Sequence, residues 1–183
     1  MYILHLSDIH YQRELGCRKK ADQGPLDGTN KKHGGVGWAA GPDGYQAMLS
    51  AMQNPLVFLD DCLDRVAGDW EKIGLVVITG DLTEDGTAED YRCLKHHIRK
   101  RIGDIPLVVT LGNHDNKRNF REGWLEEDAD SPCGLKEIGS APYNTIRRLE
   151  DTAVISFDTS VQGVPDGRMD DRKAAWLESV LKA

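Results

Sequence analysis

Three apolar segments of this 183-residue chain are each followed directly by side chains that can bind a metal ion or move a proton. These side chains are Asp8 and His10 after segment 2–6, Asp81 after segment 75–79, and Asn113, His114 and Asp115 after segment 107–109. Carboxylate, imidazole and amide groups suit hard or borderline divalent ions such as Mn, Fe, Zn or Mg. The first four residues are therefore candidate metal ligands, and the last two are candidate catalytic residues.

The chemistry that this set predicts is the hydrolysis of a phosphoester. Asp81 has two carboxylate oxygens and can bridge two ions. Two divalent ions roughly 3.5–4 Å apart clamp the attacking and leaving oxygens of a phosphoryl displacement, and they make a bridging hydroxide available near neutral pH. The His114 imidazole could protonate the leaving oxygen or stabilise the equatorial oxygens, and Asp115 could orient that imidazole.

The apolar segments predict buried strands that end at these side chains. If the strands are parallel neighbours, the candidate residues converge at their carboxyl ends, where open α/β sheets bind ligands. Alternation along the first strand puts Asp8 and His10 on one side, provided that the extended backbone continues through them. The same alternation puts His5 on the opposite side, where we expect a packed core histidine.

Helical patterns separate the strands. Asn54-Pro55 predicts one helix start, with Gly68 as a plausible stop. Thr87 predicts a second start, and Gly103 ends that helix. A strand pair is expected over 143–157, followed by a last helix that Asp170 caps, with an apolar stripe of Ala174, Leu177 and Leu181. This order of elements favours an α/β layered domain.

The region from about 11 to 54 is rich in glycine and has little periodicity. We interpret it as an insertion in a single domain of residues 1–183. A connection of this length is usually a functional lid or a disordered segment, and both a lid over the site and a passive insertion remain open. Its one histidine, His33, is expected to be a solvated loop residue.

Composition limits the partners. Acidic residues outnumber basic ones 30 to 23, giving a net charge of -7 that argues against a general nucleic-acid binder. The four cysteines include no C-x-x-C pair and predict free thiols in a reducing compartment. No signal peptide and no membrane-spanning segment is evident, so we expect a cytoplasmic protein with no membrane partner.

The three motifs together resemble the calcineurin-like metallophosphoesterase superfamily, whose signature is D-x-H, then G-D, then G-N-H-D. Here these motifs are Asp8-Ile9-His10, Gly80-Asp81 and Gly112-Asn113-His114-Asp115. The stretch ITGDLTEDGTAEDY followed by IPLVVTLGNHD is most similar to the class III cyclic-nucleotide phosphodiesterase branch.

The resemblance implies a layered β-sandwich of mixed sheets flanked by helices, two divalent ions (Mn, Fe or Zn) and a small phosphoester substrate such as a cyclic nucleotide. It implies that Asp8, His10 and Asp81 hold the first ion. Asp81 and Asn113 would hold the second, and His114 would act on the leaving group with Asp115 behind it.

The chain departs from the family pattern after His114, because no further histidine follows. Members of the family continue with another histidine and a Gly-His-x-His motif, so we expect the C-terminal part of the sandwich to be lacking here. Two other functions stay open. One is a DNA nuclease, since ILHLSDIH also resembles the start of the double-strand-break repair nucleases, and the other is a non-catalytic scaffold with this fold.

Overall fold

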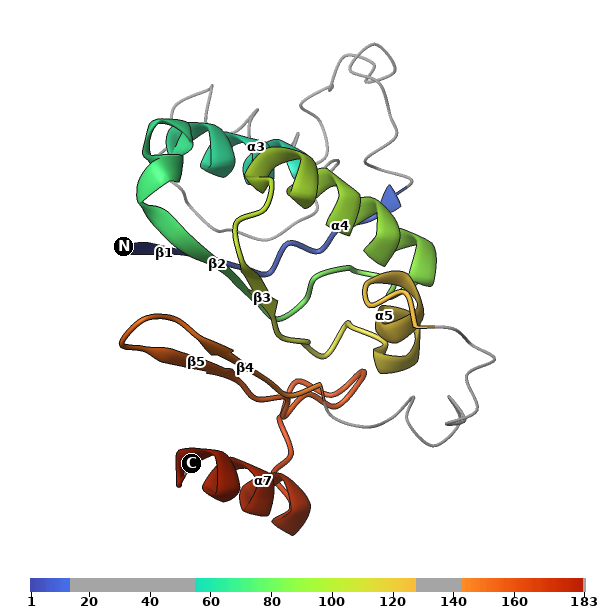
Figure 1. Ribbon diagram of the computed structural model, residues 1–183. Coiled ribbons are helices and arrows are strands. Elements are labelled where there is room, and N and C mark those ends of the chain that lie inside the picture. The colour runs from blue at the N-terminus through green and yellow to red at the C-terminus, as the bar shows by residue number, and fades with distance from the viewer. Residues whose placement is uncertain (14–54, 128–142, 183) are drawn as a thin grey trace, which may run out of the picture.

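The computed structural model describes residues 1–13, 55–127 and 143–182, and at its centre is a parallel three-stranded sheet (Figure 1). Its strands are β1 (Tyr2–Ser7), β2 (Ile73–Thr79) and β3 (Leu107–Val109), in the order β1-β2-β3. Leu6 pairs with Ile78 across β1 and β2, and Ile78 pairs with Val109 across β2 and β3. The prediction that the three strands are parallel neighbours is confirmed, so their carboxyl ends share one edge.

Four helices of the described residues accompany these strands, and α4 begins and ends at the residues that predicted it. They are α3 (Leu56–Arg65), the 3-10 helix η2 (Ala67–Lys72), α4 (Ala88–Ile102) and α5 (Lys117–Gly123). Thr87 caps α4, its hydroxyl accepting from the Asp90 backbone N–H, and Gly103 ends it at a φ of 58°. Helix α3 ends before the expected stop at Gly68, which lies within η2.

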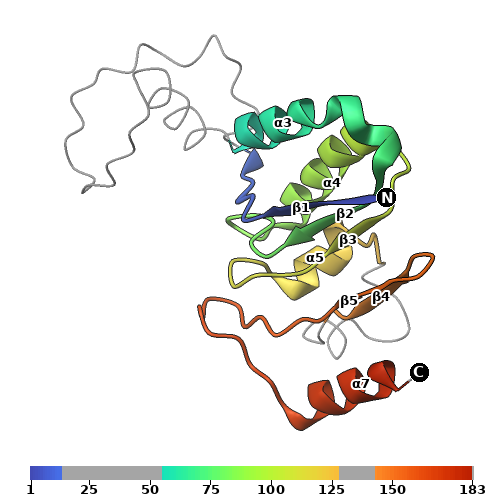
Figure 2. The ribbon, with the colours of Figure 1, turned by 90° about the vertical axis from the view of Figure 1, so that its left-hand side faces the viewer.

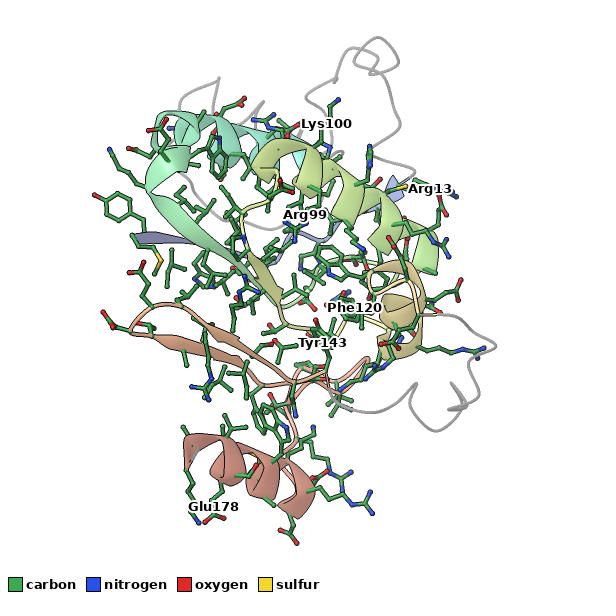
Figure 3. All side chains as sticks on the ribbon, viewed as in Figure 1. Arg13, Arg99, Lys100, Phe120, Tyr143 and Glu178 are labelled. Atoms are coloured by element: carbon green, nitrogen blue, oxygen red, sulfur yellow. The ribbon has the colours of Figure 1, made fainter. Side chains whose placement is uncertain are left out.

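The core lies between β2 and the apolar faces of α3, α4 and α5. Fully buried members include Leu63 of α3, Ile78 of β2, Leu94 of α4 and Phe120 of α5. In Figure 3, Phe120 lies between α5 and the segment that carries Tyr143, and the centroids of these two rings are 4.9 Å apart. This ring contact joins α5 to the segment around Tyr143.

A hairpin and a helix complete the described fold. The hairpin pairs β4 (Thr145–Arg148) with β5 (Ala153–Ser156), as expected, and α7 (Asp171–Leu181) follows it. In both ribbon views the hairpin lies between the three-stranded sheet and α7, while α3 lies on the other side of that sheet (Figures 1 and 2). The Ser156 hydroxyl donates to the Val109 carbonyl oxygen over 3.1 Å, which ties the hairpin to β3. The predicted α/β class is confirmed.

The expectation that His5 is a packed core histidine is wrong, and the apolar stripe of the last helix is largely exposed. His5 is exposed and its Nε2 lies 2.8 Å from the Thr79 hydroxyl, because its side of β1 is not covered by the described residues. Along α7, Ala174 and Leu181 are exposed, and Trp176 instead stacks on Phe157 with centroids 5.8 Å apart. Glu178 of α7 points outward in Figure 3.

The remaining sequence predictions fall partly outside the described residues. Residues 14–54 lie outside them. This range contains most of the predicted insertion, His33, and Asn54 at the expected start of α3. Within the described ranges, no helix combines the length and the apolar character needed to cross a bilayer.

Candidate metal centre

The carboxyl ends of the three strands bring one residue from each motif together. Ligand atoms of His10, Asp81 and His114 all lie within 4.8 Å of one another, and all three residues are half-buried. His10 Nε2 is 3.7 Å from Asp81 Oδ2. The His10 and His114 rings meet edge to face, with centroids 4.9 Å apart and planes at 80°. Two imidazole nitrogens and a carboxylate oxygen form a donor set that suits a borderline divalent cation.

Three candidate ligands have left-handed backbone conformations. The φ angles are 53° at Asp8, 49° at His10 and 38° at Asp81. Non-glycine residues adopt this region rarely, and strain of this kind clusters at functional sites. The prediction that strand alternation puts Asp8 and His10 on one side is wrong. Strand β1 ends at Ser7, and the extended backbone does not continue through Asp8 and His10.

The backbone after β1 runs beside the backbone after β2 and holds the strained segment in place. The His10 N–H donates to the Asp81 carbonyl oxygen over 2.9 Å, and the Tyr11 N–H donates to the Leu82 carbonyl oxygen over 3.1 Å. Glu84 returns a bond, its N–H donating to the Tyr11 carbonyl oxygen over 3.1 Å. The first two motifs are thus joined through the main chain as well as through side chains.

Gly112 allows the third motif to approach the second. A Cβ atom at this position would overlap both the carboxylate and the backbone nitrogen of Asp81, so only glycine fits. The approach lets the His114 N–H donate to Asp81 Oδ1 over 3.0 Å. One Asp81 oxygen therefore faces the third motif and the other faces His10.

The structure holds the other two candidate ligands, Asp8 and Asn113, in different ways. Asp8 is exposed and is not among the residues whose ligand atoms lie within 4.8 Å of one another. Asn113 is half-buried, and its backbone carbonyl oxygen accepts from the Gly163 N–H over 2.7 Å. The loop after β5 therefore fixes the Asn113 backbone.

That loop is anchored by a buried ion pair. Lys117 Nζ lies 2.6 Å from Asp158 Oδ2, and the Asp158 side chain is fully buried. Burial raises the pKa of Asp158, but hydrogen bonds from Lys117, Ser160 and the Tyr143 N–H outweigh it and hold the pKa below its usual range. Asp158 therefore remains a charged anchor between α5 and the loop that contacts Asn113.

Asp115 does not contact the His114 imidazole as its position in the sequence suggested. It is fully buried, and its two oxygens accept from four donors. The donors are the backbone N–H groups of Leu82 (3.1 Å), Thr83 (3.3 Å) and Gly112 (2.8 Å), and the Tyr91 hydroxyl (2.9 Å). Burial raises the pKa of Asp115, while these hydrogen bonds oppose the rise. Its carboxylate joins the loops after β2 and β3.

Two residues of the site were missed by the sequence argument. Tyr91 of α4 is fully buried, and its hydroxyl donates to Asp115 and accepts from the Asn116 N–H over 2.9 Å. Burial raises the pKa of Tyr91, so the hydroxyl keeps its proton. Glu84 places Oε2 2.6 Å from His10 Nδ1 and 3.4 Å from His114 Nδ1. Its only signal was an acidic residue three positions after Asp81.

The three motifs lie within the part of the chain that matches a known protein family. Residues 1–170 match the family described as Calcineurin-like phosphoesterase. The chain belongs to the calcineurin-like phosphoesterase family. The family predicted from the sequence is confirmed. Membership implies a divalent metal cofactor, and the nitrogen and oxygen donors of His10, Asp81 and His114 fit one.

Relatives of this calcineurin-like phosphoesterase support the predicted branch. A probable glycerophosphodiester phosphodiesterase of Arcobacter nitrofigilis is 31% identical over 128 residues, which is 67% of this chain and 42% of the relative. A probable cyclic nucleotide phosphodiesterase of Rhodococcus erythropolis is 30% identical over 125 residues, 67% of this chain and 38% of the relative. The 3',5'-cyclic adenosine monophosphate phosphodiesterase of Escherichia coli K12 is 26% identical over 121 residues, 65% of this chain and 38% of the relative. The matches thus span less than half the length of these relatives.

Proposed function

We propose that this protein is a dinuclear-metal phosphodiesterase that hydrolyses a small phosphodiester such as a cyclic nucleotide or a glycerophosphodiester. The observation that carries the proposal is the meeting of His10, Asp81 and His114 at one edge of the sheet, within 4.8 Å of one another. The names of the relatives support the substrate class. The architecture that goes with this proposal is the two-sheet sandwich of the family.

In this proposal the ligands divide between two ions. Asp8, His10 and Asp81 hold the first ion, and Asp81 and Asn113 hold the second. Divalent ions at this place would neutralise the charge of the phosphoester and lower the pKa of a bound water.

His114 and Asp115 have separate roles in this proposal. His114 donates a proton to the leaving oxygen, a role that requires an imidazole within hydrogen-bonding reach of the substrate. Since His114 also belongs to the close group of donors, its contribution to ion binding has to be measured together with its contribution to catalysis. Asp115 keeps the loops of the second and third motifs together, as its four donors indicate.

Removal and return of the metal test the proposal. Hydrolysis of bis-p-nitrophenyl phosphate is expected to disappear after treatment with a chelator and to return with Mn, Fe or Zn, because the side chains alone supply no strong nucleophile. Cyclic nucleotides and glycerophosphodiesters should follow the same pattern. A metal-bound protein that hydrolyses none of these would be a scaffold, and faster cleavage of DNA than of small diesters would make it a nuclease.

The leaving group provides a second test, which separates the roles of His114. His114→Ala is expected to lower turnover more for an alkyl or ribose ester than for a nitrophenyl ester, by up to about 10²–10⁴-fold, because a poor leaving group needs the proton more. The ratio of kcat values for the two esters measures this effect, and ion content after dialysis measures ligation. Equal losses on both esters together with a lower ion content would make His114 a ligand instead of an acid.

A further inference from the structure

Glu84 lies between the two imidazoles of the candidate metal centre. Its Oε2 is 2.6 Å from His10 Nδ1 and 3.4 Å from His114 Nδ1. We propose that Glu84 is a positioning residue, which fixes the tautomer and the ring orientation of His10 so that Nε2 is free to bind an ion beside Asp81. The ion-binding part of this inference rests on the proposed function, whereas the choice of tautomer does not.

The hydrogen bond determines which nitrogen carries the proton. A carboxylate oxygen accepts and does not donate, so the short contact requires a proton on His10 Nδ1. In a neutral imidazole the lone pair is then on Nε2, the atom that lies 3.7 Å from Asp81 Oδ2. Carboxylates that hold the second nitrogen of a metal-binding histidine in this way fix the ring and raise its basicity.

The backbone keeps Glu84 at this place. Its N–H donates to the Tyr11 carbonyl oxygen over 3.1 Å, and Thr83 forms a parallel bridge with Tyr11. Tyr11 is itself buried and follows His10 directly. The carboxylate and the ring that it contacts are therefore carried by two paired segments, so that their separation does not depend on a flexible loop.

The same oxygen also faces the second imidazole. At 3.4 Å the contact with His114 Nδ1 is longer than a strong hydrogen bond, so we expect Glu84 to act first on His10. The two rings are in edge-to-face contact with centroids 4.9 Å apart, and a change in the orientation of one alters the space open to the other. Removal of the carboxylate should therefore loosen both rings.

The tautomer is measured by nitrogen NMR of the metal-free protein labelled with ¹⁵N-histidine, at about pH 8, above the ordinary imidazole titration range. We expect His10 to carry its proton on Nδ1 in the wild-type protein. In Glu84→Ala the proton should move to Nε2, the favoured position in the free histidine side chain. Glu84→Gln keeps an acceptor oxygen and should retain part of the Nδ1 form. Asp85→Asn is the matched control, because Asp85 is exposed and accepts from Gln12 instead of a histidine.

Ion affinity provides the second readout. Titration with Mn alone should show about 10- to 100-fold weaker binding in Glu84→Ala, a smaller loss in Glu84→Gln and no change in Asp85→Asn. An unchanged His10 tautomer in Glu84→Ala would overturn the proposal. A changed tautomer with unchanged Mn affinity would overturn the link to ion binding. Because the NMR measurement needs neither metal nor substrate, it decides the role of Glu84 even if the protein hydrolyses no phosphodiester.

Discussion

Asp81→Asn is expected to lower phosphodiesterase turnover at least about 100-fold and to reduce the number of ions that stay bound after dialysis. Asp81 is the residue through which the second motif contacts both of the others: Oδ1 accepts from the His114 N–H over 3.0 Å, and Oδ2 is 3.7 Å from His10 Nε2. An amide keeps the shape of the side chain but replaces one of these oxygens with an NH₂ group, which cannot bind a cation or accept a hydrogen bond. Turnover of bis-p-nitrophenyl phosphate in excess Mn and ion content by mass spectrometry are the measurements.

Asp104→Asn makes the same chemical change on an exposed residue just after α4 and serves as the control. It should leave turnover and ion content unchanged. Near-normal turnover in Asp81→Asn would mean that the carboxylate does not bridge two ions. A normal ion content with low turnover would place Asp81 in catalysis but not in metal binding.

The elements that support the site were predictable because local chemistry determines them. Thr87 and Gly103 identify the ends of α4, and the apolar run from Leu75 to Thr79 identifies β2. The short segment from Leu107 to Val109 is apolar throughout and therefore predicts a buried strand, after which Gly112 allows the chain to turn. These signals act over a few residues, so they do not depend on how the rest of the chain packs.

Burial was less predictable than secondary structure. Periodicity shows which residues share a face, but it does not show whether another element covers that face. His5 and Ile3 lie on a face of β1 that remains exposed in the described structure, although the pattern suggested a core position. The apolar stripe of α7 shows the same limit, because Ala174 and Leu181 are exposed and Leu177 is half-buried, while Trp176 stacks on Phe157.

The sequence predicted that the site residues converge at the ends of the strands. It did not predict their backbone angles or their side-chain contacts. The position of Asp81 and His114 at the ends of adjacent parallel strands brings them together. Left-handed backbone at Asp8, His10 and Asp81 then redirects the side chains, and no local pattern predicts such angles. Glu84 could not be assigned to His10 without the pairing of the two loops, since 74 positions separate the residues in the chain.

Asp115→Ala is expected to lower the free energy of unfolding by about 3 kcal/mol or more. Its carboxylate is fully buried and accepts from three backbone N–H groups and the Tyr91 hydroxyl, and alanine would leave all four donors without this partner inside the protein. A buried donor that loses its acceptor costs about 1–3 kcal/mol, although relaxation and entry of water make the sum smaller than four separate losses. Urea unfolding followed by circular dichroism measures the change.

Two further variants show whether the effect comes from this network. Tyr91→Phe removes one donor to Asp115 and the acceptor of the Asn116 N–H, so its loss of stability should be smaller than that of Asp115→Ala. Asp151→Ala, in the exposed turn of the hairpin, should change the free energy of unfolding by no more than about 0.5 kcal/mol. Unchanged stability in Asp115→Ala would support the role that the sequence suggested, in which Asp115 orients the His114 imidazole. If Asp115→Ala unfolds at the wild-type urea concentration and reproduces the leaving-group dependence of His114→Ala, then Asp115 acts through the His114 imidazole, and its four hydrogen bonds are incidental to stability.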